Sequence, residues 1–234
     1  ASLIADEDFI SALVNTLLLV VTTVPIIVVT SLGTASLLVQ PIKWRGFFRA
    51  IYYWPVMISS VVVGIIWNWI FAGNFGIFNA VLTLLGIGPV DTLINPVFAW
   101  WAVVFAIVWS RTGYYMIIFV AALLAIPQSL YEASRVDGAT RWQNFLYVTL
   151  PSLKAARLMV FILATMEVFK TFPLVVTLTG GGPFEATEFT VQYIYETAFK
   201  SYEVGYASSM SMVMLVFVTV FTGLNFAISK GGRN

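Results

Sequence analysis

The chain has 234 residues, of which 60% are hydrophobic and 10% are charged, and its formal net charge is +1. Soluble domains carry roughly 25% charged residues, so this composition excludes an ordinary soluble protein and indicates an integral membrane protein. The absence of cysteine and histidine excludes disulfides, thiol nucleophiles, imidazole bases and nearly all transition-metal sites.

Five apolar stretches are long enough to cross a bilayer, which takes about 20 residues of helix. They lie near residues 9–39, 51–71, 97–124, 157–178 and 206–228. The stretches are continuously apolar and lack the alternation of a membrane β-barrel. We therefore expect a single all-α transmembrane domain over residues 1–234, built as a bundle of five helices. The first stretch is over-long and contains Pro25, so we expect it to be tilted, kinked or partly interfacial.

The distribution of charge predicts the orientation. The chain opens with the acidic segment 6–8 in place of the basic start of a cleavable signal, so we expect its first residue to lie inside a longer protein. An odd number of spans puts the two ends of the chain on opposite sides of the membrane. Of the lysine and arginine residues outside the spans, only Lys200 falls on the same side as the N-terminus. The opposite side receives Lys43, Arg45, Arg49, Arg135, Arg141, Lys154, Arg157, Lys230 and Arg233. The positive-inside rule therefore predicts an external N-terminus and a cytoplasmic C-terminus.

Residues 126–156 form a polar loop between the third and fourth spans. Pro127 ends the third span, because proline cannot continue a helix interior. From Ser129 the spacing predicts a short amphipathic helix, and Gly138 supplies a left-handed C-terminal stop. Small residues at 133, 134, 138 and 139 allow another surface to approach the backbone. A loop this polar cannot lie in hydrocarbon; it is either an ordinary solvated connection or a docking surface.

The string EASRVDGATRWQNFLYVTLP, residues 132–151, resembles the EAA loop of importer-type ATP-binding-cassette permeases. The residues in pattern are Glu132, Ala133, Asp137, Gly138, Ala139 and Pro151, while Ser134 replaces the second alanine of the name. Segments 9–16, 178–183 and 205–210 also match, so the resemblance covers essentially the whole chain. The chain is similar to the maltose-type family, and the glycine turn at 180–182 is typical of the first permease subunit of carbohydrate importers. That family has six helices, one of them ahead of Phe9.

The resemblance implies a coupling role for the polar loop. Its short helix would sit in a cleft of a cytoplasmic ATPase subunit, whose closure moves the spans between inward-open and outward-open states. Glu132 is then expected to meet a basic residue of the ATPase, and Gly138 to permit the close turn. The implied partners are a second homologous permease subunit, two ATP-binding-cassette ATPase subunits that bind ATP and magnesium, an extracytoplasmic substrate-binding protein and the lipid bilayer. The implied location is a bacterial or archaeal cytoplasmic membrane, with no nucleic acid involved.

The chain shows no catalytic machinery of its own. A phosphate-binding loop needs a Lys-Ser/Thr pair that opens a helix, whereas Pro183, Phe184 and Glu185 follow the glycine run. No histidine, cysteine or acidic pair lies within a span. We therefore predict that the chain is not an enzyme and holds no cofactor or metal, and that ATP hydrolysis comes from partner subunits.

Three charged residues, Arg111, Glu167 and Lys170, lie at similar depth within the predicted spans. Such residues are costly in a membrane and face a cavity or each other. They form either an ion network that only holds helices together or part of a substrate cavity. Two helical faces would line that cavity, and the resemblance places both at the family's sugar pocket. The faces comprise Ile107, Ser110, Arg111 and Tyr114, and Ala164, Glu167, Val168 and Thr171.

A pairing of Glu167 with Lys170 would leave Arg111 for an anion, since its planar fork suits carboxylate or phosphate. This hypothesis predicts acidic cargo, such as an oligosaccharide with uronate groups or a sugar phosphate. Weaker candidates for the pathway are Trp67, Asn68, Trp69 and Tyr115.

The sequence as a whole therefore predicts a membrane-spanning permease subunit that imports carbohydrate by ATP-driven alternating access. The main alternative is a secondary transporter that uses the buried charges for ion coupling, although no internal repeat is visible. A permease for polyamine, sulfate or another non-sugar cargo is a third interpretation, which the turn at 179–183 disfavours.

Overall fold

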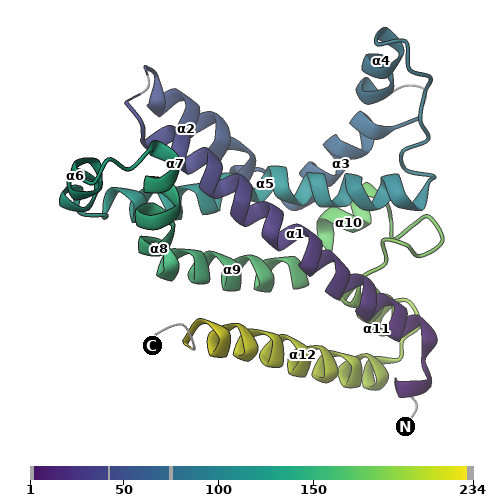
Figure 1. Cartoon of the computed structure of the whole chain (residues 1–234). Coiled ribbons are helices and arrows are strands. Elements are labelled where there is room, and N and C mark those ends of the chain that lie inside the picture. The colour runs from purple at the N-terminus through teal and green to yellow at the C-terminus, as the bar shows by residue number, and fades with distance from the viewer. Residues whose placement is uncertain (1–2, 42, 74–75, 231–234) are drawn as a thin grey trace.

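A computed structural model of the chain describes residues 3–41, 43–73 and 76–230, and every regular element in this part is helical (Figure 1). The long helices are α1 (Glu7–Val39), α5 (Pro96–Leu124), α9 (Lys154–Phe169) and α12 (Val204–Lys230). Shorter helices connect them: η1 (Leu3–Ala5), α2 (Arg45–Tyr53), η2 (Trp54–Met57), α3 (Ser60–Phe71), α4 (Ile77–Leu84), α6 (Gln128–Val136), α7 (Arg141–Asn144), η3 (Phe145–Thr149), α8 (Leu150–Ser152), α10 (Pro173–Leu178) and α11 (Thr190–Phe199).

Helix α1 is one continuous helix of 33 residues, with Pro25 inside it. Asp6 caps its N-terminus by accepting a hydrogen bond of 2.9 Å from the backbone N–H of Phe9. At 1.5 Å per residue the helix is about 50 Å long, well beyond the roughly 30 Å hydrocarbon core. It crosses α5 and α9 obliquely (Figure 1), and it continues through Pro25 without a break.

Within the part of the chain that the structure describes, three helices are long and apolar enough to cross a membrane alone: α1, α5 and the segment Val204–Gly223 of α12. They begin and end within a few residues of the first, third and fifth predicted spans. Counting two bent helix pairs as further spans raises the number to at most five. The side chains of 4 and 224–230 are outside the described part of the structure, and so is the predicted basic residue Arg233.

The second predicted span is not one straight helix. The segment Arg45–Met57 meets Ser60–Phe71 at an angle of 100°. Pro55 lies in the tight turn η2, and Ile58 after it is extended, so the regular helix cannot continue through this point. Helix α3 alone has only 12 residues.

The fourth predicted span is also interrupted. Helix α9 ends at Phe169, residues 170–172 are not helical, and Pro173 opens the short helix α10. At its other end α9 follows Arg141–Ser152 at an angle of 67°. The apolar run at 157–178 therefore contains a break that its composition did not predict.

The core lies where α1 packs against α5 and α9. The buried face of α5 includes Ala99, Ala102 and Ala106, whose small side chains let neighbouring membrane helices approach closely. Helix α12 packs against α9 and α11, but only 11% of its apolar window is buried. Most of its surface therefore faces lipid or another subunit.

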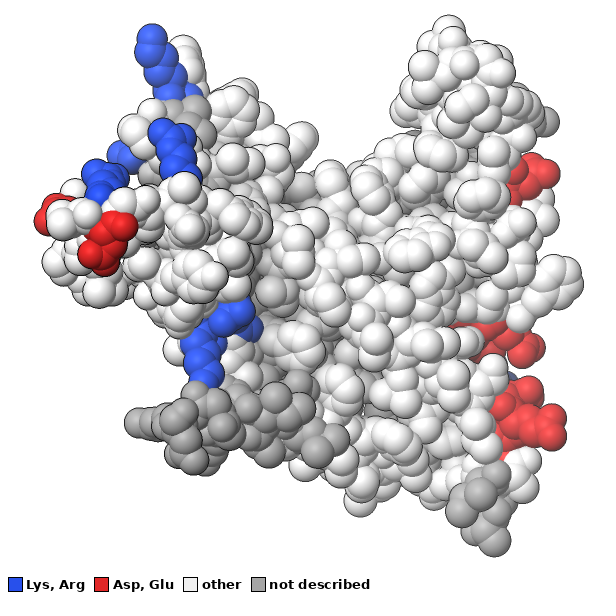
Figure 2. Space-filling model, in the orientation of Figure 1, with Lys and Arg blue, Asp and Glu red and all other residues white. Residues whose placement is uncertain are grey.

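The two ends of the molecule differ in charge. We call the end that carries α2, α6 and α7 the loop end, and the end that carries α11 and the start of α1 the outer end. Lysine and arginine side chains gather at the loop end, together with acidic side chains on α6, whereas acidic side chains dominate the outer end (Figure 2). The start of α1 and the end of α12 lie at opposite ends (Figure 1), as expected for an odd number of crossings.

Candidate functional site

The polar loop presents a short helix, α6, that projects from the loop end (Figure 1). None of its residues is buried. Glu132, Ala133 and Asp137 are exposed, and Val136 is 88% exposed. A single exposed apolar side chain is ordinary on a protein surface, so the exposure of the whole helix, and not Val136 alone, makes α6 available to another molecule.

Gly138 ends α6 in the predicted manner. Its φ is 75°, which is the left-handed region that glycine adopts without strain. The N–H of Ala139 donates to the carbonyl of Ser134 at 3.0 Å, and the N–H of Gly138 donates to that of Arg135 at 3.1 Å. This is the glycine-ended C-cap that was expected from the sequence.

One side-chain contact holds α6 against the body of the molecule. The hydroxyls of Tyr131 and Thr149 are 3.0 Å apart, which joins α6 to η3. A capping box between Thr140 and Gln143 starts α7. The segment η3 is a π-helix, a type of turn frequent at functional sites. It leads directly into α8, where Pro151 lies, and then into α9. Sequence reasoning missed both the hydroxyl contact and the π-helix.

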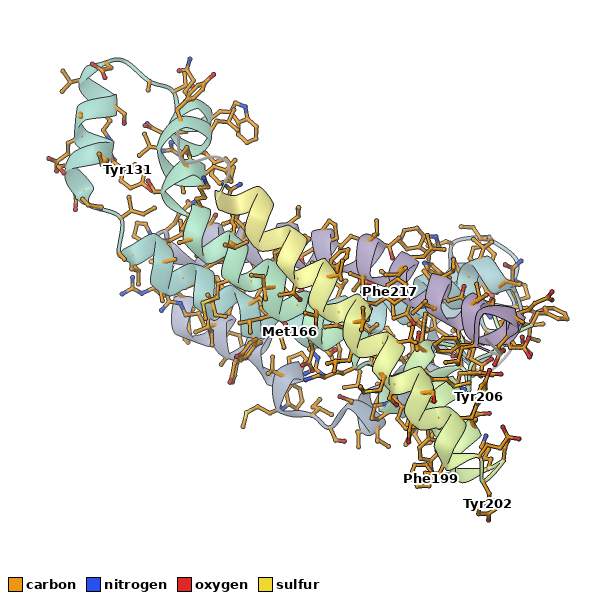
Figure 3. The ribbon with its side chains drawn as sticks, turned by 90° about the horizontal axis from the view of Figure 1, so that it is seen from below. Tyr131, Met166, Phe199, Tyr202, Tyr206 and Phe217 are labelled. Atoms are coloured by element: carbon orange, nitrogen blue, oxygen red, sulfur yellow. The ribbon has the colours of Figure 1, made fainter. Side chains whose placement is uncertain are left out.

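We call Arg111, Glu167 and Lys170 the central ion cluster. Arg111 Nη2 is 2.7 Å from Glu167 Oε1, and it also donates to the Ser60 hydroxyl at 3.2 Å. Arg111 lies about 22 Å along α5 from Pro96, close to the middle of that helix. Met166, the neighbour of Glu167, lies midway between Tyr131 at the loop end and Tyr206 at the outer end (Figure 3).

The ion pair is an interhelical one, as in the ion network that was one of the two interpretations, and it is not the Glu167–Lys170 pairing on which the acidic-cargo hypothesis for Arg111 depended. Glu167 pairs with Arg111 from α5 and not with Lys170 on its own helix. Lys170 is the C-cap of α9 and its N–H still donates to the carbonyl of Glu167 at 3.1 Å, so the two residues are one turn apart, but their side chains form no ion pair. The long guanidinium side chain of Arg111 reaches Glu167 from the adjacent helix instead.

The cluster surrounds a cavity of about 30 Å³, which is close to the volume of one water molecule. Its lining residues are Ser60, Ile107, Ser110, Arg111, Glu167, Lys170, Thr171, Pro173 and Leu174. Five of the eight residues predicted for the pathway are thus brought together. Ser60 and the start of α10 were missed, since nothing in the sequence signals that the bend before α3 and the break after α9 meet.

The other three predicted pathway residues lie elsewhere in this structure. Ala164 and Val168 are buried in the hydrophobic core. Tyr114 is 45% exposed and its ring packs edge-on against Tyr115 at 5.1 Å. Among the weaker candidates, Trp67 belongs to an aromatic group with Phe71, Phe105 and Trp109, and Trp69 is 73% exposed.

The break after α9 is supported by α3. Asn68 Nδ2 donates to the carbonyl of Leu178 at 2.7 Å, and the Thr177 hydroxyl lies 3.2 Å from the carbonyl of Val61. Gly64 permits this approach, because a Cβ there would collide with the Thr177 hydroxyl and the Leu174 carbonyl. Irregular backbone at membrane depth occurs where it is buried in protein or lines a cavity, and here Lys170, Thr171 and Pro173 line the cavity.

The glycine run at 180–182 is a turn. Gly180 and Gly181 have φ values of 66° and 94°. Their carbonyls accept hydrogen bonds from Gln192 Nε2 at 3.0 Å and from the N–H of Thr187 at 3.2 Å. No helix begins at this point, so the segment lacks the helix that a phosphate-binding loop requires. The prediction of a turn is confirmed.

Asp6 and Glu188 organise the outer end. Asp6 accepts hydrogen bonds from the hydroxyls of Tyr206 at 2.7 Å and Tyr193 at 3.3 Å, which ties α1 to α11 and α12. Burial opposes ionisation of Asp6, but the hydrogen bonds from Phe9, Tyr206 and Tyr193 outweigh it and lower its pKa. Burial, followed by the charges of Glu196 and other nearby carboxylates, raises the pKa of Glu188 to about 7. Within the described residues, no three acidic side chains gather closely enough to hold a metal ion.

Residues 27–233 match the family described as binding-protein-dependent transport system inner membrane component. The chain is 33% identical to the trehalose/maltose transport system permease protein MalF of Thermococcus litoralis, over 88% of this chain and 70% of that protein. It is 33% identical to the xylose/arabinose import permease protein XacH of Haloferax volcanii, over 99% of this chain and 74% of that protein. It is 32% identical to the diacetylchitobiose uptake system permease protein NgcF of Streptomyces coelicolor, over 96% of this chain and 67% of that protein.

Solved structures share the fold. A chain of a bacterial ABC transporter involved in the import of the acidic polysaccharide alginate superposes with a TM-score of 0.87 at 23% identity, covering 100% of this chain and 82% of that chain. A chain of an amino acid ABC transporter superposes with a TM-score of 0.62 at 19% identity, covering 98% of this chain and 96% of that one. The predicted class, an all-helical importer-type membrane subunit, is confirmed.

Proposed function

Because the chain belongs to the family of binding-protein-dependent transport system inner membrane components, we propose that it is one permease subunit of a carbohydrate importer. Three relatives named for sugar uptake, each 32% or 33% identical over most of both chains, support the cargo class. The subunit works by alternating access, with a second homologous permease subunit completing the pathway. An extracytoplasmic binding protein delivers the sugar.

The observation that carries this proposal is the projecting helix α6. It is polar, wholly unburied and joined through α7, η3 and α8 to α9, the helix that bears Glu167. A partner that binds and moves α6 would therefore also move the chain segment that leads to the central ion cluster. We assign this contact to one of two ATPase subunits, which bind ATP and magnesium and carry out the hydrolysis. This chain supplies no catalytic group and no cofactor.

In this arrangement Glu132 forms an ion pair with the ATPase, since its side chain is exposed and makes no salt bridge within the described residues. The small residues Ala133, Ser134 and Ala139 allow close approach, Gly138 sets the turn, and Asp137 and Pro151 complete the segment. The loop end faces the cytoplasm and the outer end faces the binding protein. The basic character of the loop end supports this orientation (Figure 2).

The test is the ATPase activity of the assembled complex in liposomes with sugar-loaded binding protein. Glu132→Ala is expected to lower the stimulated rate at least about tenfold, in line with the 2–5 kcal/mol measured when one partner of an interfacial charge pair is removed. Gln128→Ala, an exposed residue at the first position of the same helix, is the matched control and keeps the wild-type rate. If no ATPase copurifies and Glu132→Ala transports normally, the secondary-transporter alternative replaces this proposal.

A further inference from the structure

The central ion cluster contains three charged side chains but only one ion pair. Arg111 is held by Glu167 at 2.7 Å and by Ser60 at 3.2 Å. Among the described residues, no carboxylate lies within 4.0 Å of the Lys170 ammonium. The cavity therefore carries one positive formal charge in excess, and that charge belongs to Lys170.

An unpaired cation is costly near the middle of a membrane protein. Lys170 gains some compensation because it stands at the C-terminus of α9, where the helix dipole favours a positive charge. Its ammonium can still interact with another group while it caps α9, because Lys170 is exposed and also lines the cavity. The hydroxyl-bearing residue Ser60 lines the same cavity.

We propose that Lys170 makes the importer selective for carbohydrates that carry an anionic group, a carboxylate or a phosphate, and that Arg111 does not bind this group. The inference rests on the proposed function and names the cargo class of the same site. Lys170 contacts the anion as a compact point charge with three donors. Ser60, which accepts from Arg111, still has its own hydroxyl proton to donate.

The size of the cavity limits how the anion binds. About 30 Å³ admits a water molecule and excludes a sugar ring. The Arg111 and Glu167 side chains are 31% and 42% exposed, so the cluster opens to the surface of this single chain. The sugar therefore lies on the open side, where the second permease subunit closes the site, and the anionic group alone points toward Lys170.

The proposal predicts opposite effects for two charge-removing substitutions. Lys170→Gln removes the free cation, so preference for anionic over neutral cargo falls by about 10- to 100-fold, the range for a hydrogen bond to a charged group. Glu167→Gln frees Arg111, so the same preference rises. Lys170→Arg keeps the charge and preserves the preference. Lys200→Gln removes a lysine that pairs with Glu196 at the outer end and leaves the preference unchanged.

The experiment measures initial uptake into liposomes that contain the full complex, with the cognate binding protein and ATP. The probes are trigalacturonate against galactotriose, and glucose 6-phosphate against glucose, so that carboxylate and phosphate are separate arms. The expected result is wild-type preference for at least one anionic probe, lost in Lys170→Gln and raised in Glu167→Gln.

Three results overturn the inference. The first is wild-type uptake that favours the neutral probe in both arms. The second is an unchanged preference in Lys170→Gln. The third is an equal loss of anionic and neutral uptake in Lys170→Gln, which identifies Lys170 as a cap of α9 only. Absence of ATP-dependent uptake for all four sugars contradicts the carbohydrate-importer proposal itself and is thereby distinguishable from these.

Discussion

Glu188 is the residue at the outer end whose ionisation changes most near neutral pH. It lies in the segment that links the glycine turn to α11, and its side chain is partly buried. Asn15 of α1 donates to its backbone carbonyl at 3.2 Å. Burial, then the charges of Glu196, Glu185 and Asp8, raises its pKa from 4.5 to about 7. A carboxyl group with a raised native pKa makes stability depend on pH in a definite direction.

Below pH 4.5 Glu188 is protonated in both the folded and the unfolded states. Between pH 4.5 and about 7 the unfolded chain releases this proton while the folded chain retains it, so the contribution to stability falls as pH rises. We expect Glu188→Gln to show a smaller loss of thermal midpoint than wild type between pH 5 and pH 8. Glu7→Gln, at an exposed position in the first turn of α1, should follow the wild type. Parallel midpoint curves for Glu188→Gln and wild type would refute the assignment.

Ordinary helix rules predict three of the long helices well and fail at the bent ones. Helices α1, α5 and α12 were predictable from long apolar runs. Capping residues mark where two of them begin: Asp6 for α1, and Asn95 for α5, whose side chain accepts a hydrogen bond from the Val97 N–H at 3.0 Å. The 100° bend before α3 and the break after α9 interrupt runs that look continuous in sequence. Both depend on contacts between distant segments, which one-dimensional patterns do not contain.

The candidate sites show the same division. The end of α6 at Gly138 was predictable because a glycine C-cap is a local signal. The ion-pair partner of Glu167 was not predictable, because the sequence offered both Arg111 and Lys170. Only the packing of α5 against α9 brings Arg111 to Glu167. Hydroxyl contacts such as Tyr131 with Thr149 leave no pattern at all, since each residue is common in loops.

The packing of α10 on α3 depends on Gly64. An alanine Cβ at this position would meet the Thr177 hydroxyl and the backbone carbonyl of Leu174, and the backbone carbonyl cannot rotate away. We expect Gly64→Ala to destabilise the purified complex by about 1–3 kcal/mol, the usual effect of overpacking. The measurement is the midpoint of thermal denaturation in detergent.

Gly33→Ala is the control for that measurement, because nothing lies within 4 Å of a Cβ at position 33 of α1. It should be neutral or slightly stabilising, since alanine is the better helix former. Equal thermal midpoints for Gly64→Ala and Gly33→Ala would show that α3 and α10 can move apart with little loss of stability.

Charge at the two ends of the molecule fixes its proposed direction in the membrane. The chain contains no cysteine, so single cysteines introduced by mutation report position without background. We expect Lys43→Cys, next to α2 at the loop end, to react with a membrane-impermeant maleimide only in inside-out vesicles. Glu203→Cys, just before α12 at the outer end, should react only in right-side-out vesicles. The reverse pattern of labelling would place the N-terminal end in the cytoplasm and contradict the proposed orientation of the chain in the membrane.

The size of the cavity in the central ion cluster also determines whether ions can leak through it. It has room for about one water molecule, and an ion pair lies in its wall. A space of this size conducts neither a hydrated ion nor a chain of water molecules that relays protons. The cavity of this chain therefore adds no ion-conducting path of its own at the midplane. In the proposed importer, sugar passage would open the site on one side at a time, so we expect the leak current measured without ATP to rise when Arg111 and Glu167 separate.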